Sequence, residues 1–178
     1  MPHQVALLRA VNLGARNRIA MPLLRELVEG LGYADARTHL QSGNVVYRGD
    51  DDPQQAARRI EAALAEGAGL DVRVIVRTQK ELAAVVERDP MAELATEPRR
   101  YFVAFLAEPA PKAALAELEP DGFLPERFSA REREIYVWLP GGMRRARLTQ
   151  AFWERRLAVA VTLRNWNTVR DLAALMAG

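Results

Sequence analysis

The order of apolar segments recurs along the chain, and this recurrence constrains the fold more than any other feature of the sequence. In the first half, runs rich in β-branched residues alternate with segments whose leucines and alanines repeat at helical spacing. This βαββαβ order is that of a ferredoxin-like sandwich, in which two helices cover one face of an antiparallel sheet. We predict these six elements, in order, at residues 4–11, 22–31, 36–41, 44–48, 53–67 and 71–77.

The second half repeats the same order. A connecting helix is predicted between the halves, because Thr78 and Glu81 have the spacing of a capping box and Asp89-Pro90 ends the helical pattern. The predicted fold class is therefore α+β, with two ferredoxin-like repeats at residues 1–78 and 99–178, joined by a helix and linker at 79–98. The second repeat is expected at 100–107, 111–118, 123–129, 134–139, 148–157 and 160–164, with an extra C-terminal helix at 166–176.

Composition excludes several classes of function. The 178 residues include no Cys and two His, so disulfides, thiolate zinc sites, iron–sulfur clusters and cysteine nucleophiles are excluded. A hydrophobic fraction of 49% supplies a packed interior. No run reaches the roughly 18 apolar residues of a membrane span, and no signal region precedes the first strand. We expect a cytoplasmic protein that has no cofactor, no metal and no membrane partner.

Positive charge is concentrated in two segments. Residues 9–25 hold four arginines and no acid, and residues 141–170 hold seven arginines against Glu154 alone. All but two of the 25 basic residues are arginines, the exceptions being Lys80 and Lys112. Two alternative explanations fit this use of arginine in place of lysine. One is a coding bias, and the other is a functional preference for the bidentate contacts that arginine makes. The net charge of +2 therefore understates two local basic patches.

The predicted topology brings the polar loops together in pairs. The first and second strands of such a repeat run one way and the third and fourth run the other. The loop at 12–18 and the hairpin at 41–44 are thus expected at one end of the first sheet. In the second repeat, the loop at 140–149 and the segment at 164–168 are likewise expected to share one end.

The second pair has the character of an anion site. Gly141-Gly142 permits close backbone approach, three arginines follow, and Thr149 and Asn165 lie where helices begin with free N–H groups. Neither a P-loop nor a dinucleotide-binding glycine motif occurs. The alternative is structural: the glycines turn the chain, Thr149 and Asn165 cap helices, and the arginines are solvated.

Three segments, at 7–27, 38–49 and 147–176, closely resemble the bacterial domain-of-unknown-function family numbered 1697, through QSGNVV and RNWNTV in particular. The resemblance covers essentially the whole chain. It implies a two-subdomain α+β fold of ferredoxin-like character and no established activity. Members of that family usually have Lys where Arg16 stands and Ser-Lys where Ala146-Arg147 stand, so charge is retained here while the hydroxyl at 146 is lost.

These observations lead to a hypothesis of one basic cleft between the repeats. The leading function is a binding module for a phosphate-bearing small molecule or single-stranded nucleic acid. The alternatives are an enzyme acting on a phosphorylated small molecule, with Thr149 or His39 assisting, and a protein-interaction domain in which the motifs hold the repeats together. The predicted ligand-binding residues are Asn12, Arg16, Gln41, Ser42, Asn44, Arg147, Thr149, Arg164, Asn165, Trp166 and Asn167. For three residues a purely structural role is the alternative: His39 as a structural histidine, Ser42 as part of a turn and Trp166 as part of the core.

Overall fold

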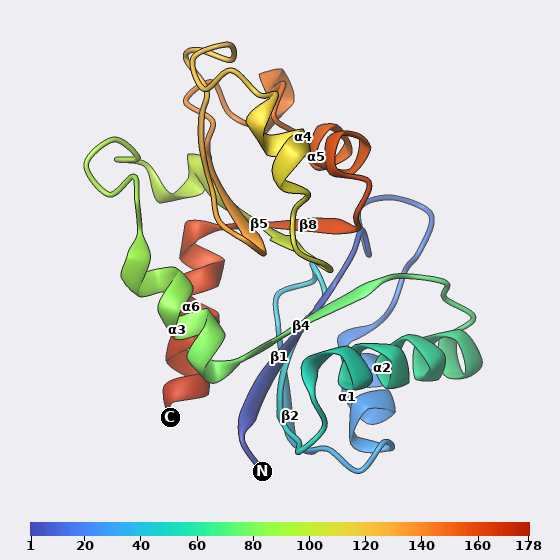
Figure 1. Ribbon diagram of the computed structural model, residues 1–178. Coiled ribbons are helices and arrows are strands. Elements are labelled where there is room, and N and C mark those ends of the chain that lie inside the picture. Colours follow the sequence, from blue (N-terminus) through green and yellow to red (C-terminus); the bar gives the residue numbers. More distant parts are fainter. The chain divides into compact units, whose positions relative to one another are not determined.

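A computed structural model describes all 178 residues and contains two four-stranded antiparallel sheets (Figure 1). The first sheet has the strand order β2-β3-β1-β4, and all of its neighbouring strands are antiparallel. Its elements are β1 (His3–Leu8), α1 (Met21–Glu29), β2 (Ala34–His39), β3 (Asn44–Arg48), α2 (Pro53–Ala68) and β4 (Val74–Thr78).

The second sheet repeats this plan with the order β6-β7-β5-β8. Its elements are β5 (Tyr101–Leu106), α4 (Lys112–Ala116), β6 (Arg127–Ala130), β7 (Glu134–Trp138), α5 (Gln150–Leu157) and β8 (Val161–Asn165). The remaining elements are α3 (Gln79–Arg88), α6 (Trp166–Ala177) and the short 3-10 helices η1 (Pro98–Arg100) and η2 (Met143–Arg145). The predicted α+β class with two βαββαβ repeats is therefore confirmed.

Contacts between Cα atoms divide the chain into two compact units. Unit 1 comprises residues 1–83 and 172–178, and unit 2 comprises residues 84–171. The connecting helix α3 begins in the first unit and ends in the second, and α6 begins in the second and ends in the first. Each unit is described separately below.

Each unit has its own apolar core on one face of its sheet. In unit 1, alternate residues of β1, β3 and β4 pack against the apolar faces of α1 and α2. In unit 2, alternate residues of β5, β7 and β8 pack against α5, whose Trp153 is fully buried. The strand residues are Ala6, Leu8, Val45, Tyr47, Val74 and Val76 in unit 1, and Ala104, Leu106, Ile135, Val137 and Val161 in unit 2.

The helix starts follow the local signals in the sequence. Thr78 and Glu81 form the predicted capping box: the Thr78 N–H donates to Glu81 Oε2 at 2.8 Å, and the Glu81 N–H donates to Thr78 Oγ1 at 3.2 Å. Asp52 caps α2 by accepting the N–H groups of Gln54 and Gln55. None of the helices is long and apolar enough to cross a membrane.

Several strands differ from their predicted bounds. Strand β1 ends at Leu8 rather than at residue 11, and β4 begins at Val74 rather than at residue 71. Two further differences are explained by the backbone. The second strand ends at His39 rather than at residue 41, because Leu40 adopts a φ of 61°, which is incompatible with an extended strand. Strand β6 begins at Arg127 rather than at residue 123, because residues 120–125 turn and the Gly122 N–H donates to the Glu119 carbonyl instead of to a neighbouring strand.

Candidate functional site

Asn12 holds the loop after β1 in a closed conformation. Its side-chain Nδ2 donates to the Ile19 carbonyl at 3.0 Å, and its Oδ1 accepts the Ile19 N–H at 2.9 Å. The same Nδ2 donates to the Gln41 carbonyl at 2.8 Å, so the loop is joined to the β2–β3 hairpin. The two loops therefore meet at one end of the first sheet, as the topology predicts. The side-chain amide of Asn12 is therefore occupied by hydrogen bonds that hold these two loops together.

The hairpin itself is held by its own motif residues. Asn44 is fully buried, and its Nδ2 donates to the His39 carbonyl at 2.7 Å and to Ser42 Oγ at 2.9 Å. Gly43 has a φ of +81°, and a Cβ placed there would lie 2.6 Å from Val11 Cγ2 and 2.9 Å from Leu8 Cβ. The Ser-Gly-Asn part of the motif thus sets the backbone of the hairpin.

An open pocket of about 400 Å³ lies at this end of unit 1. Its walls come from the closed loop, from the start of α1 and from the hairpin. The lining residues are Asn12, Arg18, Ile19, Ala20 and Gln41. Of the predicted site residues, Asn12 and Gln41 line this pocket, and Arg16 lies exposed on the loop that forms its wall.

The pocket is electropositive. Arg16 and Arg18 are exposed and make no hydrogen bond or ion pair, and Arg18 lines the pocket. Ala20, the N-cap residue of α1, has no side chain that can accept from the first turn, so the N–H groups of Met21 and Leu23 receive no side-chain cap; Pro22 has no N–H. The first turn of α1 also contains no acidic residue. Cationic side chains and helix N–H groups both favour an anion at this place.

Backbone strain gathers at the same end of the sheet. Ala10, Asn12, Asn17 and Leu40 all have φ between 52° and 61°, although none is a glycine. Left-handed conformations at such residues cost free energy, and they persist where the surrounding structure imposes them. The hydrogen bonds of Asn12 and the close approach of Gly43 supply this constraint.

In unit 2, Arg147 and Thr149 contact neighbouring backbone groups. The Arg147 guanidinium donates to the Leu124 carbonyl at 3.1 Å and to the Gly122 carbonyl at 3.4 Å, and its Cζ lies 5.5 Å from the centre of the Phe123 ring. Thr149 is the N-cap of α5, and its Oγ1 accepts the Phe152 N–H at 3.2 Å. Both side chains thus order loops of unit 2.

The RNWN segment is similarly engaged. Arg164 is 6% exposed and donates to Thr162 Oγ1 at 2.7 Å and to the Leu163 carbonyl at 3.0 Å. Burial lowers the pKa of its guanidinium to about 10. Asn165 Oδ1 accepts the Thr168 N–H, and Trp166 is buried with its ring centre 4.8 Å from that of Tyr101. Asn167 is half-buried.

Within each unit, hydrogen bonds join some of the predicted site residues. The structure brings together Asn12, Gln41 and Ser42 with the loop of Arg16, and it joins Arg147 to residues 122–126. Strands β7 and β8 are both antiparallel to β5, so they finish at the same end of the sheet. No hydrogen bond, however, links the loop at 140–149 with residues 165–168.

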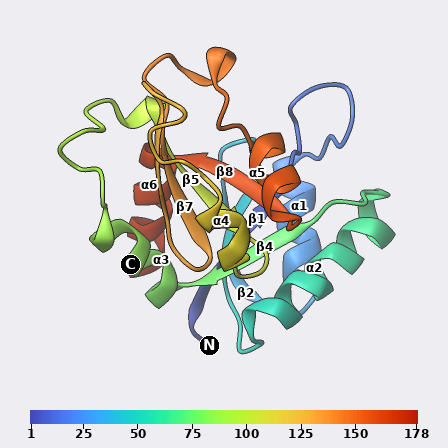
Figure 2. The same cartoon turned by 45° about the horizontal axis from the view of Figure 1, so that its top comes forward.

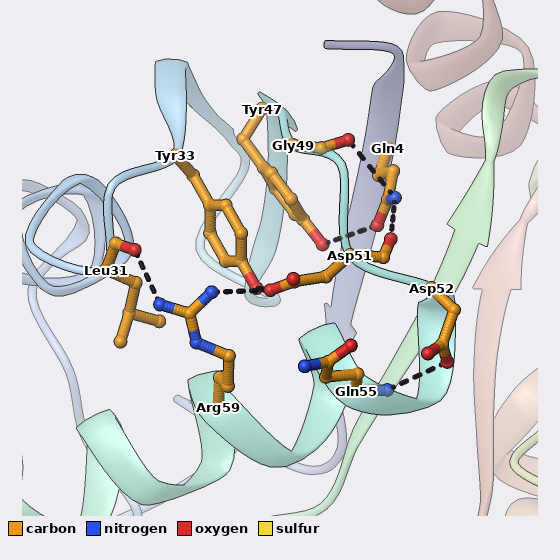
Figure 3. A network of polar contacts seen from close by, with 9 residues as sticks. All are labelled: Gln4, Leu31, Tyr33, Tyr47, Gly49, Asp51, Asp52, Gln55 and Arg59. Carbon is orange, nitrogen blue, oxygen red and sulfur yellow. Dashed lines mark hydrogen bonds and ion pairs between the residues drawn. The ribbon is translucent and has the colours of Figure 1, made fainter.

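A second polar network lies in unit 1, around Asp51 (Figure 3). Asp51 Oδ2 accepts the Tyr33 hydroxyl at 2.6 Å and forms an ion pair with Arg59, whose guanidinium also donates to the Leu31 carbonyl at 2.7 Å. The Tyr33 and Tyr47 rings stack with centres 4.6 Å apart, and the Tyr47 hydroxyl donates to Gln4 Oε1 at 3.0 Å. Periodicity gives no signal for such a network.

The ionisation of this network favours a structural role. Hydrogen bonds from Tyr33 and then from Arg59 lower the pKa of the Asp51 carboxyl. Desolvation and the hydrogen bond to Asp51 raise the pKa of the Tyr33 hydroxyl to about 12. Asp51 is thus held as a carboxylate and Tyr33 as a phenol, and each is already bonded to the other. The network joins the start of α2 to the residue that precedes β2.

Two residues important to these sites, Arg18 and Glu126, were not predicted from the sequence. Arg18 lines the pocket, and the acid-free basic run at 9–25 was the signal that could have singled it out beside Arg16. Glu126 is buried, and its carboxylate accepts the backbone N–H groups of Arg147 and Leu148. Nothing in the local sequence distinguishes it from other acids. No group of three or more His, Cys, Asp or Glu side chains comes together as a metal site.

Comparison with known proteins gives a family and a fold. A family model described as a protein of unknown function (DUF1697) matches residues 1–136. No curated protein matches the chain. Among solved structures, the chain is similar to the conserved bacterial protein SP0830 from Streptococcus pneumoniae, with 18% sequence identity, a TM-score of 0.73 and 98% of each chain covered. At this identity the likeness supports the fold alone.

Proposed function

The chain belongs to the DUF1697 family of unknown function, and we propose that it is a binding module whose pocket in unit 1 takes the phosphate group of a small molecule. The observation that carries this proposal is the unpaired Arg18 in the wall of a 400 Å³ pocket at the uncapped start of α1. Arg16 on the same loop adds a second unpaired cation. Guanidinium groups match the geometry of phosphate oxygens and bind them bidentately.

The aromatic side chains favour a small molecule over single-stranded nucleic acid. Proteins that bind single strands stack the bases on exposed aromatic side chains. In this chain every Phe, Tyr and Trp is buried or half-buried, so no fully exposed aromatic ring is offered for stacking. The pocket volume lies within the range of small-molecule sites, roughly 300–1,000 Å³. A compact phosphate ester fits these features.

The test is calorimetric titration of the wild-type protein and an Arg18→Ala variant with inorganic phosphate, a sugar phosphate and a nucleoside monophosphate. We expect at least one ester to bind the wild type, and we expect its Kd to rise about tenfold or more in Arg18→Ala. Arg58→Ala is the matched control, because Arg58 is exposed on α2, makes no hydrogen bond and lies outside the pocket.

Four outcomes would contradict the proposal. Binding by none of the compounds would remove the proposed ligand class, and equal losses in Arg18→Ala and Arg58→Ala would reduce the effect to net charge. Tighter binding of an oligonucleotide with a steep salt dependence would favour nucleic acid instead. Release of inorganic phosphate from a bound ester would favour the alternative of an enzyme acting on phosphorylated small molecules.

A further inference from the structure

Two loops of unit 2 are clamped together by a buried carboxylate and an arginine. Glu126 is 7% exposed, and its oxygens accept the Arg147 N–H at 2.9 and 3.1 Å and the Leu148 N–H at 2.9 Å. In return, the Arg147 guanidinium donates to the carbonyls of Gly122 and Leu124. We call the clamped residues 122–126 and 142–147 the Glu126 platform. The long connection from β7 through η2 to α5 is visible in Figure 2.

The Glu126 platform exposes both apolar and cationic side chains. Leu124 is 48% exposed and Met143 is 42% exposed, which places both among the few exposed large apolar side chains. Arg144 and Arg145 are exposed, and their side chains make no hydrogen bond or ion pair. A buried carboxylate that orders a loop with exposed apolar and cationic side chains is the arrangement of a preorganised contact surface.

The free charge of the Glu126 platform is positive. Asp121 on the adjoining turn is paired with Arg127 at 3.1 Å, and Glu126 is engaged with backbone amides. Glu119 is exposed, and its carboxylate has no partner. The unpaired charges here are therefore two arginines and one carboxylate. An anionic partner therefore matches the platform by charge complementarity.

The chemistry of this partner follows from the apolar residues. Phe123, Phe128 and Phe152 at this end of unit 2 pack edge to face with one another or with Trp153, with ring centres 5.0–6.1 Å apart, so they are unavailable for stacking on bases. Leu124 and Met143 instead offer flexible aliphatic contacts of the kind used by adaptable protein-binding surfaces. We propose that the Glu126 platform is a docking surface for an acidic protein segment that also carries aliphatic residues.

The test uses two synthetic peptides labelled with a fluorophore, one of glutamates interspersed with leucines and one in which serines replace the leucines. Binding is measured by fluorescence polarisation. We expect the leucine peptide to bind the wild type about tenfold more tightly than the serine peptide. The Leu124→Ser/Met143→Ser variant should remove this difference, and Arg144→Ala/Arg145→Ala should weaken both peptides about tenfold.

Controls keep the proposal open to refutation. Arg25→Ala/Arg58→Ala removes the same charge from exposed positions of unit 1 and should leave both affinities unchanged. If the Leu124→Ser/Met143→Ser variant has a lower melting temperature than the wild type, Met143→Ser alone replaces it in the binding test. Equal binding of the two peptides, unchanged binding by the Arg144/Arg145 variant, or tighter binding of an oligothymidylate of equal charge would each overturn the proposal. Because the pocket in unit 1 is untouched, these outcomes are independent of the proposed phosphate binding.

Discussion

Glu126 accepts the backbone N–H of Arg147 with both carboxylate oxygens, at 2.9 and 3.1 Å, across 21 residues of sequence. A buried carboxylate that satisfies backbone donors replaces the water they would otherwise bind. The relationship shows how this chain uses polar side chains: they order loops, and the loops then present other residues. Asn12 does the same in unit 1 by holding Ile19 and Gln41.

Replacing Glu126 with Gln should destabilise the protein and loosen residues 122–126 and 142–147. The amide keeps one acceptor but turns an NH2 group toward the N–H donors of Arg147 and Leu148. We expect a loss of about 1–3 kcal/mol in the free energy of unfolding, measured by urea denaturation. The control is Glu119→Gln, an exposed carboxylate without a partner. A loss in Glu126→Gln no larger than in the control would show that the clamp contributes nothing.

Replacing Gly43 with Ala should be more damaging than replacing Gly69 with Ala. Both glycines have positive φ, +81° and +64°, so the conformational penalty is shared. Only at Gly43 does the new Cβ meet other atoms, those of Val11 and Leu8, whereas at Gly69 nothing lies within 4 Å. We expect an additional loss of about 1–3 kcal/mol for Gly43→Ala in thermal or urea unfolding. Equal losses would mean that the hairpin moves freely away from β1.

Removing the Asn12 side chain should open the loop that forms the pocket wall. In Asn12→Gly the φ of 55° is tolerated, while the hydrogen bond to the Ile19 N–H is lost. Hydrogen exchange at the Ile19 amide should therefore accelerate by about tenfold or more. Asn17→Gly is the matched control, because Asn17 has a φ of 52° and its side chain makes no hydrogen bond. Unchanged exchange at Ile19 would refute the role given to Asn12.

Stability at low pH should depend on Asp51. Hydrogen bonds from Tyr33 and Arg59 lower the pKa of its carboxyl below the ordinary 3.8, so the unfolded chain takes up this proton first as the pH falls. The contribution is complete above the ordinary pKa and is lost as the pH falls through the lowered one. Urea midpoints measured against pH should fall less steeply for Asp51→Asn than for the wild type. Asp71→Asn, at an exposed position, should keep the wild-type slope.

Stability at high pH should depend on the four tyrosines. Burial is the first cause that raises the pKa of every tyrosine hydroxyl, to about 12 for Tyr33 and Tyr136 and further for Tyr47 and Tyr101. The folded protein therefore retains protons that the unfolded chain releases near pH 10, and its stability falls as the pH rises above this value. Ultraviolet titration should show no tyrosinate before the protein begins to unfold. A tyrosine that ionises reversibly near pH 10 in the folded state would contradict this.

The secondary structure was largely predictable because its causes are local. The Thr78 and Glu81 capping box, the Asp52 cap and the apolar spacing of α2 each depend on residues within one or two turns. A repeated βαββαβ order then restricts the topology, since few arrangements bury all of the apolar faces. The meeting of the loop at 12–18 with the hairpin at 41–44 followed from that topology alone, and the structure confirms it.

The use of each polar side chain was decided by the tertiary structure. Asn12 reaches Gln41 across 29 residues, and Arg147 reaches Gly122 across 25, and no periodicity records such pairs. Polar residues in a loop bond whichever backbone groups the packed elements bring near them. Sequence alone therefore identified the order of the elements, the caps and the two basic segments. Only the folded chain determined that Asn12, Asn44 and Arg147 order their loops while Arg16, Arg18, Arg144 and Arg145 remain free, because that division depends on distances between segments remote in sequence.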